Sequence, residues 1–349
     1  MLNKVLQFNK SQNSIEEYLF SIRQGVPLAA FGVCDSFKHY LSSILDRPVL
    51  YVTKDLVSAR KTQKEISELT DKPVYLLPPF NDLLLNFKGQ AKDGLIERAN
   101  GVSQLSLGGI CVAPIESLFQ PVFKNAKSIN LERNSDYDIN DITKSLVQMG
   151  YAIKERVESK GTFSQRGDIL DVYIPFIEFP VRLDFFGDTL ETIKTFDCET
   201  GRTEKFLDKV EITQVSPFSY TEKDYAIFKE KAEKELIYAK KKGLYNLELL
   251  ASDALTSIDV KDGFSLLQFS CFSENFANIF DLLNKDTVII FDEAKAVYDL
   301  SKLQQTEFTE RYNSLFNQGE TFSFAKEQFF TEESFINGIS RYSLANFST

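Results

Sequence analysis

Apolar residues recur along the first third of the chain in two alternating patterns, short unbroken runs and longer runs with helical spacing. The unbroken runs predict buried strands at residues 28–33, 48–53, 73–79 and 109–114. Apolar side chains three and four residues apart predict amphipathic helices at about 35–45, 56–69 and 95–107. Because strands that alternate with helices pair in parallel, this part of the chain predicts a parallel sheet with helices on both faces.

The pattern changes near residue 130. A helical stretch ends near Gly150, and short strand patterns then follow at close intervals to about residue 215. Turn residues such as Gly167, Gly187 and Gly201 separate these strands. This spacing predicts a small antiparallel α+β domain over residues 129–216.

The pattern of strands and helices returns after residue 217. A long helical stretch is followed by TVIIFDEAKAVYDL, residues 287–300, which predicts a buried strand and a helix. We therefore expect residues 1–128 and 217–349 to be two parts of a single α/β lobe that holds the small domain as an insertion. Residues 322–349 show no clear closing element, so we expect the chain to be a piece of a longer protein.

Composition narrows the possible functions. The formal net charge is -10 and the pI is about 5.0, which disfavours a free-standing DNA-binding protein because such proteins are usually basic. The four cysteines lie far apart and His39 is the only histidine, so a zinc site and a histidine-based triad are also disfavoured. No signal peptide or membrane-spanning run is visible, and we expect a cytoplasmic location without membrane contact.

The first candidate site is the segment GVCDSFKH, Gly32 to His39, between a predicted strand and a predicted helix. Gly32 and Lys38 match the first glycine and the lysine of the phosphate-binding loop G-x-x-x-x-G-K-[ST]. Phe37 replaces the second glycine and is expected on the apolar face of the helix, for which Asp35 is the expected N-cap. His39 replaces the hydroxyl that binds magnesium, an ion that prefers oxygen ligands. The segment therefore predicts a nucleotide loop without its chemistry.

The second candidate is VIIFDEAK, residues 288–295, an apolar strand that ends in acidic residues. In an active nucleotide site Asp292 would hold magnesium and Glu293 would activate water. The alternative is a strand end whose Asp292 caps the next helix, and the damaged first loop favours this alternative. Together the segments predict a degenerate RecA-like (P-loop NTPase-like) lobe with no catalytic residue, metal or cofactor of its own.

Strand periodicity singles out one exposed face in the small domain. In PVRLDFF, residues 180–186, Val181 and alternate residues point to one side, and Arg182 and Phe186 point to the other. An exposed aromatic ring beside an arginine is typical of a protein-binding hot spot. Periodicity alone leaves a second possibility open, in which Phe186 packs under a loop or against the preceding helix.

These residues also carry a family resemblance. RGDILDVYIP, residues 166–175, followed by PVRLDFFGDTLETIKTFD, residues 180–197, resembles the second domain of bacterial transcription-repair coupling factors. The excinuclease B subunit has a related version. The stretches PVLYVTKDLVSARKTQKEI, LPPFNDLLL and ICVAPIESLFQPV are similar to the coupling factor's first domain more loosely. The chain therefore resembles the N-terminal, excinuclease-B-like module of that family.

The resemblance implies a non-catalytic adaptor. It implies that Arg166, Arg182 and Phe186 bind excinuclease A in transcription-coupled nucleotide excision repair, and that the C-terminal part of the full-length protein masks them. RNA polymerase, DNA, ATP and magnesium would be bound by domains beyond this chain. The alternative is an active ATP-dependent excinuclease B-type helicase. The substituted loop argues against it, as does the region LLPPFNDLLLNFKGQ after Tyr75, which lacks a tyrosine-rich hairpin.

Overall fold

The chain folds into two compact units. The computed structural model describes residues 13–81, 83–84, 92–125, 127–175, 177–261 and 263–349. Unit 1 contains residues 1–124 and 220–349, and unit 2 contains residues 125–219, so the chain enters and leaves unit 2 once. The sequence analysis predicted the two junctions at residues 128/129 and 216/217.

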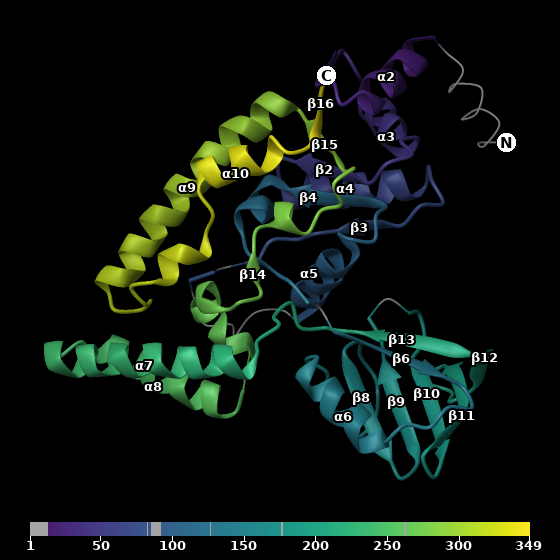
Figure 1. Ribbon diagram of the computed structural model, residues 1–349, viewed down its shortest axis with the longest axis vertical. Coiled ribbons are helices and arrows are strands. Elements are labelled where there is room, and N and C mark those ends of the chain that lie inside the picture. Colours follow the sequence, from purple (N-terminus) through teal and green to yellow (C-terminus); the bar gives the residue numbers. More distant parts are fainter. Residues whose placement is uncertain (1–12, 82, 85–91, 126, 176, 262) are drawn as a thin grey trace. The chain divides into compact units, whose positions relative to one another are not determined.

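Unit 1 is built on a six-stranded sheet in which all neighbouring strands are parallel (Figure 1). Its strand order is β1-β16-β15-β2-β4-β3. The strands are β1 (Leu28–Phe31), β2 (Val49–Thr53), β3 (Val74–Leu76), β4 (Ile110–Pro114), β15 (Val288–Asp292) and β16 (Ser343–Ser348). The sheet thus combines strands from both parts of the lobe.

Two apolar cores lie on opposite faces of this sheet because successive strand residues point to opposite sides. On β2, Leu50 and Val52 belong to the first core, and Val49 and Tyr51 belong to the second core. The second core contains residues of α2 (Asn13–Arg23), α3 (Asp35–Ser43) and α4 (Leu56–Ser67). The first contains residues of α5 (Lys92–Gln104), η2 (Ile115–Phe119), η4 (Ile279–Asp281), α9 (Ala294–Asn317) and α10 (Glu332–Ile339).

A helical part of unit 1 has a core of its own. It is formed by α7 (Glu222–Lys242), α8 (Tyr245–Asp259) and η3 (Gly263–Phe272), with η5 (Ala325–Gln328) in contact with η3. A capping box at Thr221 and Asp224 starts α7, and Gly243 ends it in the left-handed conformation. A two-stranded sheet of β5 (Val122–Phe123) and β14 (Phe276–Ala277) lies in the same unit.

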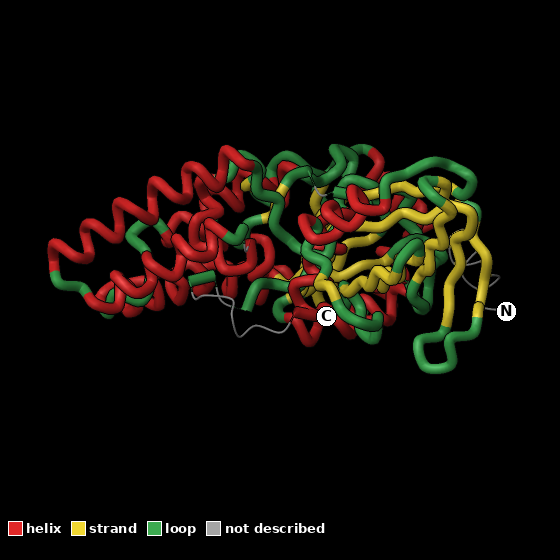
Figure 2. The backbone as a smooth tube through the Cα atoms, turned by 90° about the horizontal axis from the view of Figure 1, so that it is seen from below, coloured by secondary structure: helices red, strands yellow, loops and turns green. Residues whose placement is uncertain are grey.

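Unit 2 is a small α+β domain. Its main sheet has the order β12-β11-β10-β9-β8-β7, antiparallel except for the β7–β8 pair (Figure 1). Strands are yellow and helices red in Figure 2. The strands are β7 (Ala152–Ile153), β8 (Thr162–Arg166), β9 (Ile169–Tyr173), β10 (Val181–Phe186), β11 (Thr189–Phe196) and β12 (Thr203–Leu207). β6 (Ser128–Glu132) and β13 (Lys209–Thr213) form a separate pair, and α6 (Ile139–Gln148) completes the unit.

The predicted fold class is confirmed, a parallel-sheet α/β lobe with an inserted, mainly antiparallel α+β domain. Two expectations about the lobe are wrong. The C-terminal stretch does contain a closing element, because β16 inserts between β1 and β15. The first predicted strand is not buried, because β1 lies at the sheet edge and Phe31 is 80% exposed.

Candidate functional site

The loop of the predicted nucleotide site is short. Only residues 32–34 separate β1 from α3, and Gly32 has the left-handed φ of 69° that favours glycine. The amides of Phe37 and Lys38 both donate to the Cys34 carbonyl at 3.0 Å, inside the first turn of α3. A phosphate loop needs its backbone amides directed at the ligand, so these two amides are already used.

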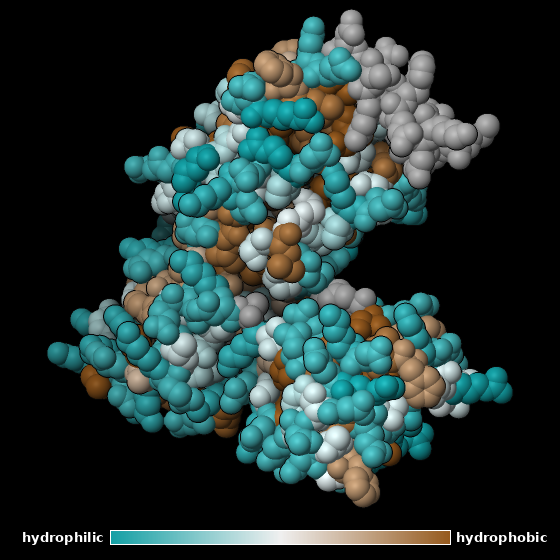
Figure 3. Space-filling view, turned by 45° about the vertical axis from the view of Figure 1, so that its right-hand side comes forward, coloured by the Kyte–Doolittle hydropathy of each residue, from teal (hydrophilic) through white to brown (hydrophobic). Residues whose placement is uncertain are grey.

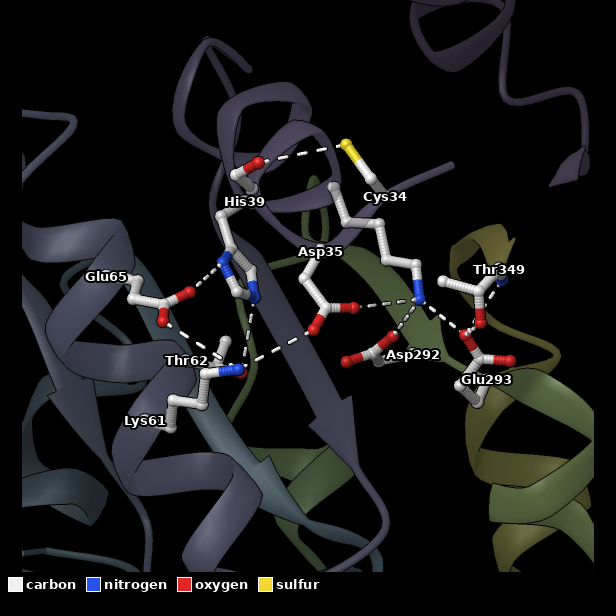
Figure 4. Close-up of polar contacts among 11 residues, drawn as sticks. Cys34, Asp35, His39, Lys61, Thr62, Glu65, Asp292, Glu293 and Thr349 are labelled. Carbon is white, nitrogen blue, oxygen red and sulfur yellow. Dashed lines mark hydrogen bonds and ion pairs between the residues drawn. The ribbon is translucent and has the colours of Figure 1, made fainter. Parts of the chain in front are cut away.

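The lysine of this segment is buried in a cluster of carboxylates. Lys38 is 1% exposed, and its Nζ lies 2.9 Å from Asp292 Oδ1, 2.5 Å from Glu293 Oε1 and 3.7 Å from Asp35 Oδ1. We call Lys38, Asp35, Asp292 and Glu293 the Lys38 cluster (Figure 4). It brings together both candidate nucleotide motifs, which are 254 residues apart in sequence, and satisfies the lysine with protein carboxylates.

Hydrogen bonds within the Lys38 cluster favour the charged forms of Lys38 and Glu293. Burial alone would lower the pKa of Lys38, but hydrogen bonds to Glu293 and Asp292 raise it above its ordinary value. Burial opposes the ionisation of Glu293 as well, yet hydrogen bonds from Lys38 and Thr349 lower its pKa to about 2. Thr349 contributes its backbone N–H at 2.8 Å and its hydroxyl at 2.5 Å (Figure 4). The carboxylate of Glu293 therefore has three donors already.

The imidazole of His39 is directed at side chains of α4. Its Nδ1 lies 2.7 Å from Glu65 Oε2 on α4, and its Nε2 lies 3.4 Å from the Thr62 hydroxyl (Figure 4). Burial lowers the pKa of the imidazole, although Glu65 acts in the opposite direction. The ring therefore joins α3 to α4, and its nitrogens are directed at protein groups.

Three local predictions at this site are wrong. Phe37 is 39% exposed and stacks on Tyr40, while Lys38 and His39 take the buried positions of α3. The N-cap of α3 is Cys34 rather than Asp35. Asp292 does not cap α9 either, because Glu293 is the N-cap residue in a left-handed conformation, without a side-chain cap bond. Asp35 and Asp292, the two residues expected to cap helices, instead form ion pairs with Lys38.

The second candidate site lies on the outward face of the unit 2 sheet. We call this set of side chains the arginine face, and its members are Arg166, Asp171, Arg182, Asp184, Phe186 and Lys194. Register places them on one side: Arg182 lies opposite Asp171 on β9 and opposite Lys194 on β11. The alternate residues Val181, Leu183 and Phe185 are buried on the other side, as predicted.

Asp171 joins the two arginines. It is 2% exposed, and it accepts hydrogen bonds from Arg182 Nε at 2.7 Å, Arg182 Nη2 at 2.9 Å and Arg166 Nη2 at 2.9 Å. The Arg182 guanidinium also lies over the Phe196 ring at 4.4 Å from its centroid. The hydrogen bonds to Asp171 raise the pKa of Arg182 despite partial burial. Both cations are thus fixed in position before any partner arrives.

Phe186 lies at the end of the same strand with its ring in solvent. It is 75% exposed, which excludes the possibility that it packs under a loop or against α6. Arg182, Asp184 and Phe186 occupy alternate positions of β10 and so share a face. The structure therefore brings the three predicted partner-binding residues, Arg166, Arg182 and Phe186, onto one face of one sheet.

The sequence interpretation missed two residues of this face. Asp171 lies between the buried Leu170 and Val172 in DILDVY. Because successive strand residues point to opposite sides, the sequence could have placed Asp171 on the side opposite to these two apolar residues. Lys194 pairs with Asp184 at 2.6 Å, but the spacing alone could not show it because the β10–β11 register contains a bulge.

Within the described residues, no group of three or more His, Cys, Asp or Glu side chains is placed to hold a metal ion. In the same part of the chain, every helix is too short or too polar to cross a bilayer. The region after Tyr75, in which a tyrosine-rich hairpin was not expected, lies partly outside the described residues, at residues 82 and 85–91.

Comparison with known proteins finds a family model similar to unit 2 and relatives similar to most of the chain. A family model described as the UvrB interaction domain matches residues 129–218. A transcription-repair-coupling factor of Staphylococcus epidermidis is 27% identical over 320 residues, covering 86% of this chain and 27% of that protein. The Bacillus subtilis factor is 23% identical over 352 residues, covering 93% of this chain and 30% of that protein.

These matches confirm the resemblance inferred from the sequence. The Staphylococcus haemolyticus factor adds a third relative, 26% identical over 299 residues, which are 79% of this chain and 25% of that protein. The chain spans less than a third of the length of these curated relatives. It is similar to the N-terminal module of a transcription-repair-coupling factor over most of its own length.

Proposed function

We propose, on the premise that this chain is a relative of the transcription-repair-coupling factors, that it is a non-catalytic adaptor that binds excinuclease A. The observation that carries the proposal is the arginine face inside a UvrB interaction domain. Arg166 and Arg182 are fixed by one buried carboxylate, and Phe186 stands exposed on the same face. A preorganised cation pair beside an exposed aromatic ring has the composition of an interface hot spot.

The proposal extends to the role of the complete protein. The adaptor recruits excinuclease A to RNA polymerase stalled at DNA damage, in the cytoplasm. Domains outside this chain bind the polymerase and DNA and use ATP and magnesium. The full-length protein masks the arginine face until it is activated, so residues 1–349 alone bind excinuclease A more tightly than the full-length protein does.

The nucleotide-like site of unit 1 is proposed to be inactive. The short loop, the ion-paired Lys38 and the orientation of His39 toward Glu65 support this proposal. An ATP molecule at this loop would have to displace carboxylates from a buried ammonium and would place its phosphates beside Asp35, Asp292 and Glu293. Like charges at this separation repel strongly in a partly buried site.

Replacing Arg182 with alanine should weaken excinuclease A binding by about 2 kcal/mol, because it removes a fixed cation from the arginine face. Calorimetric titration of the wild-type chain and the variant with excinuclease A measures the change. Arg23→Ala is the matched control, since Arg23 belongs to unit 1 and its pair with Asp46, at 3.5 Å, is exposed. Equal affinities for wild type and Arg182→Ala would remove Arg182 from the interface, and an absence of wild-type binding would refute the adaptor function.

A further inference from the structure

A second exposed aromatic ring lies on the side of the unit 2 sheet that carries the arginine face. Phe206 belongs to β12 and is 64% exposed, which is close to the exposure of Phe186. The resemblance to coupling factors assigned no role to it. We propose that Phe206 is a second aromatic anchor for excinuclease A, so that the interface extends across the sheet from β8 to β12. This inference rests on the proposed function.

The strand register places Phe206 in line with the arginines. Lys194 on β11 lies directly opposite Phe206 on β12 and opposite Arg182 on β10. Directly opposed residues of antiparallel strands project to the same side of a sheet. Asp171, Arg182, Lys194 and Phe206 therefore form one row across β9, β10, β11 and β12.

The described part of unit 2 leaves this ring mostly in solvent. β12 is the edge strand of its sheet, and its other residues from Thr203 to Lys205 are polar and exposed. An exposed phenylalanine on an edge strand adds little to folding and is a liability for aggregation. On the molecular face drawn in Figure 3, hydrophobic side chains form small patches within a mainly hydrophilic surface. An exposed ring next to an ordered row of charges fits a partner contact.

The net charge of the arginine face indicates the chemistry of the complementary patch on the partner. Three cations (Arg166, Arg182 and Lys194) and two carboxylates (Asp171 and Asp184) give the arginine face a net charge of +1, in a chain of net charge -10. Neighbouring strands are about 4.8 Å apart, so Phe206 lies roughly 10 Å from Arg182 along the row. The complementary patch on excinuclease A therefore has acidic groups opposite the arginines, flanked by one apolar hollow for Phe186 and another for Phe206.

The test compares phenylalanine rings that are all more than 60% exposed. Phe206→Ala should weaken excinuclease A binding at least tenfold in calorimetric titration of the whole chain, whereas Phe206→Tyr, which retains the ring, should stay within threefold of wild type. Phe20→Ala is the matched control, because Phe20 is 65% exposed but belongs to α2 of unit 1. The double variant Phe186→Ala, Phe206→Ala should show the product of the two single effects, since the rings contact different hollows.

Phe206→Ala within twofold of wild type, with Phe186→Ala clearly weakened, would overturn the second anchor and leave the proposed function standing. Loss of affinity in Phe20→Ala equal to that in Phe206→Ala would overturn it as well, because the effect would not be specific to the face. No binding of the wild-type chain would refute the proposed function, and the inference would fall with it.

Discussion

Replacing Asp171 with alanine is expected to lower the free energy of unfolding of unit 2 by about 2–3 kcal/mol and to weaken excinuclease A binding at the same time. Removal of one partner from a buried ion pair costs about 3–5 kcal/mol, and the partial exposure of Arg182 lets water reduce this cost. Without the carboxylate, Arg166 and Arg182 lose their shared anchor and must be ordered by the partner. Urea denaturation followed by circular dichroism measures the first effect, and calorimetry measures the second.

The control for this prediction is an aspartate-to-alanine substitution at an exposed ion pair of the same unit. Asp141 pairs with Lys144 at 3.1 Å, and both side chains are 72% exposed. Asp141→Ala should change stability by less than about 1 kcal/mol, as exposed pairs do. If Asp171→Ala behaved like Asp141→Ala in both measurements, Asp171 would not be the residue that positions the arginines.

Lys38→Ala is expected to destabilise unit 1 by about 3 kcal/mol, because it leaves three carboxylates around an empty, buried position. Asp292 on β15 and Glu293 before α9 would face Asp35 on α3 without a cation between them. Urea denaturation of wild type and variant at neutral pH measures the difference. Lys54→Ala is the control, since the pair of Lys54 with Asp55, at 3.9 Å, is exposed.

Acid should act differently on wild type and on Lys38→Ala. The pKa of Glu293 falls from 4.5 to about 2 in the folded wild type, so its contribution to stability is complete above pH 4.5 and is lost as the pH falls through about 2. In the variant the Lys38 donor is gone, the pKa of Glu293 rises, and this loss of stability on acidification becomes smaller. Equal acid sensitivity of the two proteins would contradict the claim that Lys38 lowers the pKa of Glu293.

Nucleotide provides a check on the same site. Because the cluster already satisfies Lys38, magnesium ATP should leave the melting temperature of the wild-type chain unchanged. A rise in melting temperature with ATP that Lys38→Ala abolishes would support the active helicase alternative instead.

The alternation of apolar runs was enough to predict the layered lobe and the inserted domain. β2, β4 and β15 are buried on both sides, so their residues read as unbroken apolar runs. β16 was missed because SLANFS contains half-buried polar residues between its apolar ones, and the strand is paired on both sides by strands far from it in sequence. Contacts between residues far apart in sequence leave no such local pattern.

The arginine face could be predicted from local sequence, whereas the Lys38 cluster could not. Strand parity predicted that Arg182 and Phe186 share a face, since this depends only on neighbouring residues of one strand. The burial of Lys38 could not be predicted, because helical spacing marks charged residues as exposed. Its position depends on Asp292 and Glu293, which reach it from another strand end. The αL backbone of Glu293, with φ 56°, likewise has no local sequence signal.

The central claim is that the outward face of unit 2 binds excinuclease A, and affinity of the Phe186→Ala variant tests it most directly. Phe186 is 75% exposed, so its truncation should leave the fold intact and act on binding alone. Calorimetric titration should show wild-type binding that Phe20→Ala retains and Phe186→Ala weakens by about 2 kcal/mol or more. Binding of wild type and Phe186→Ala with equal affinity would contradict the claim.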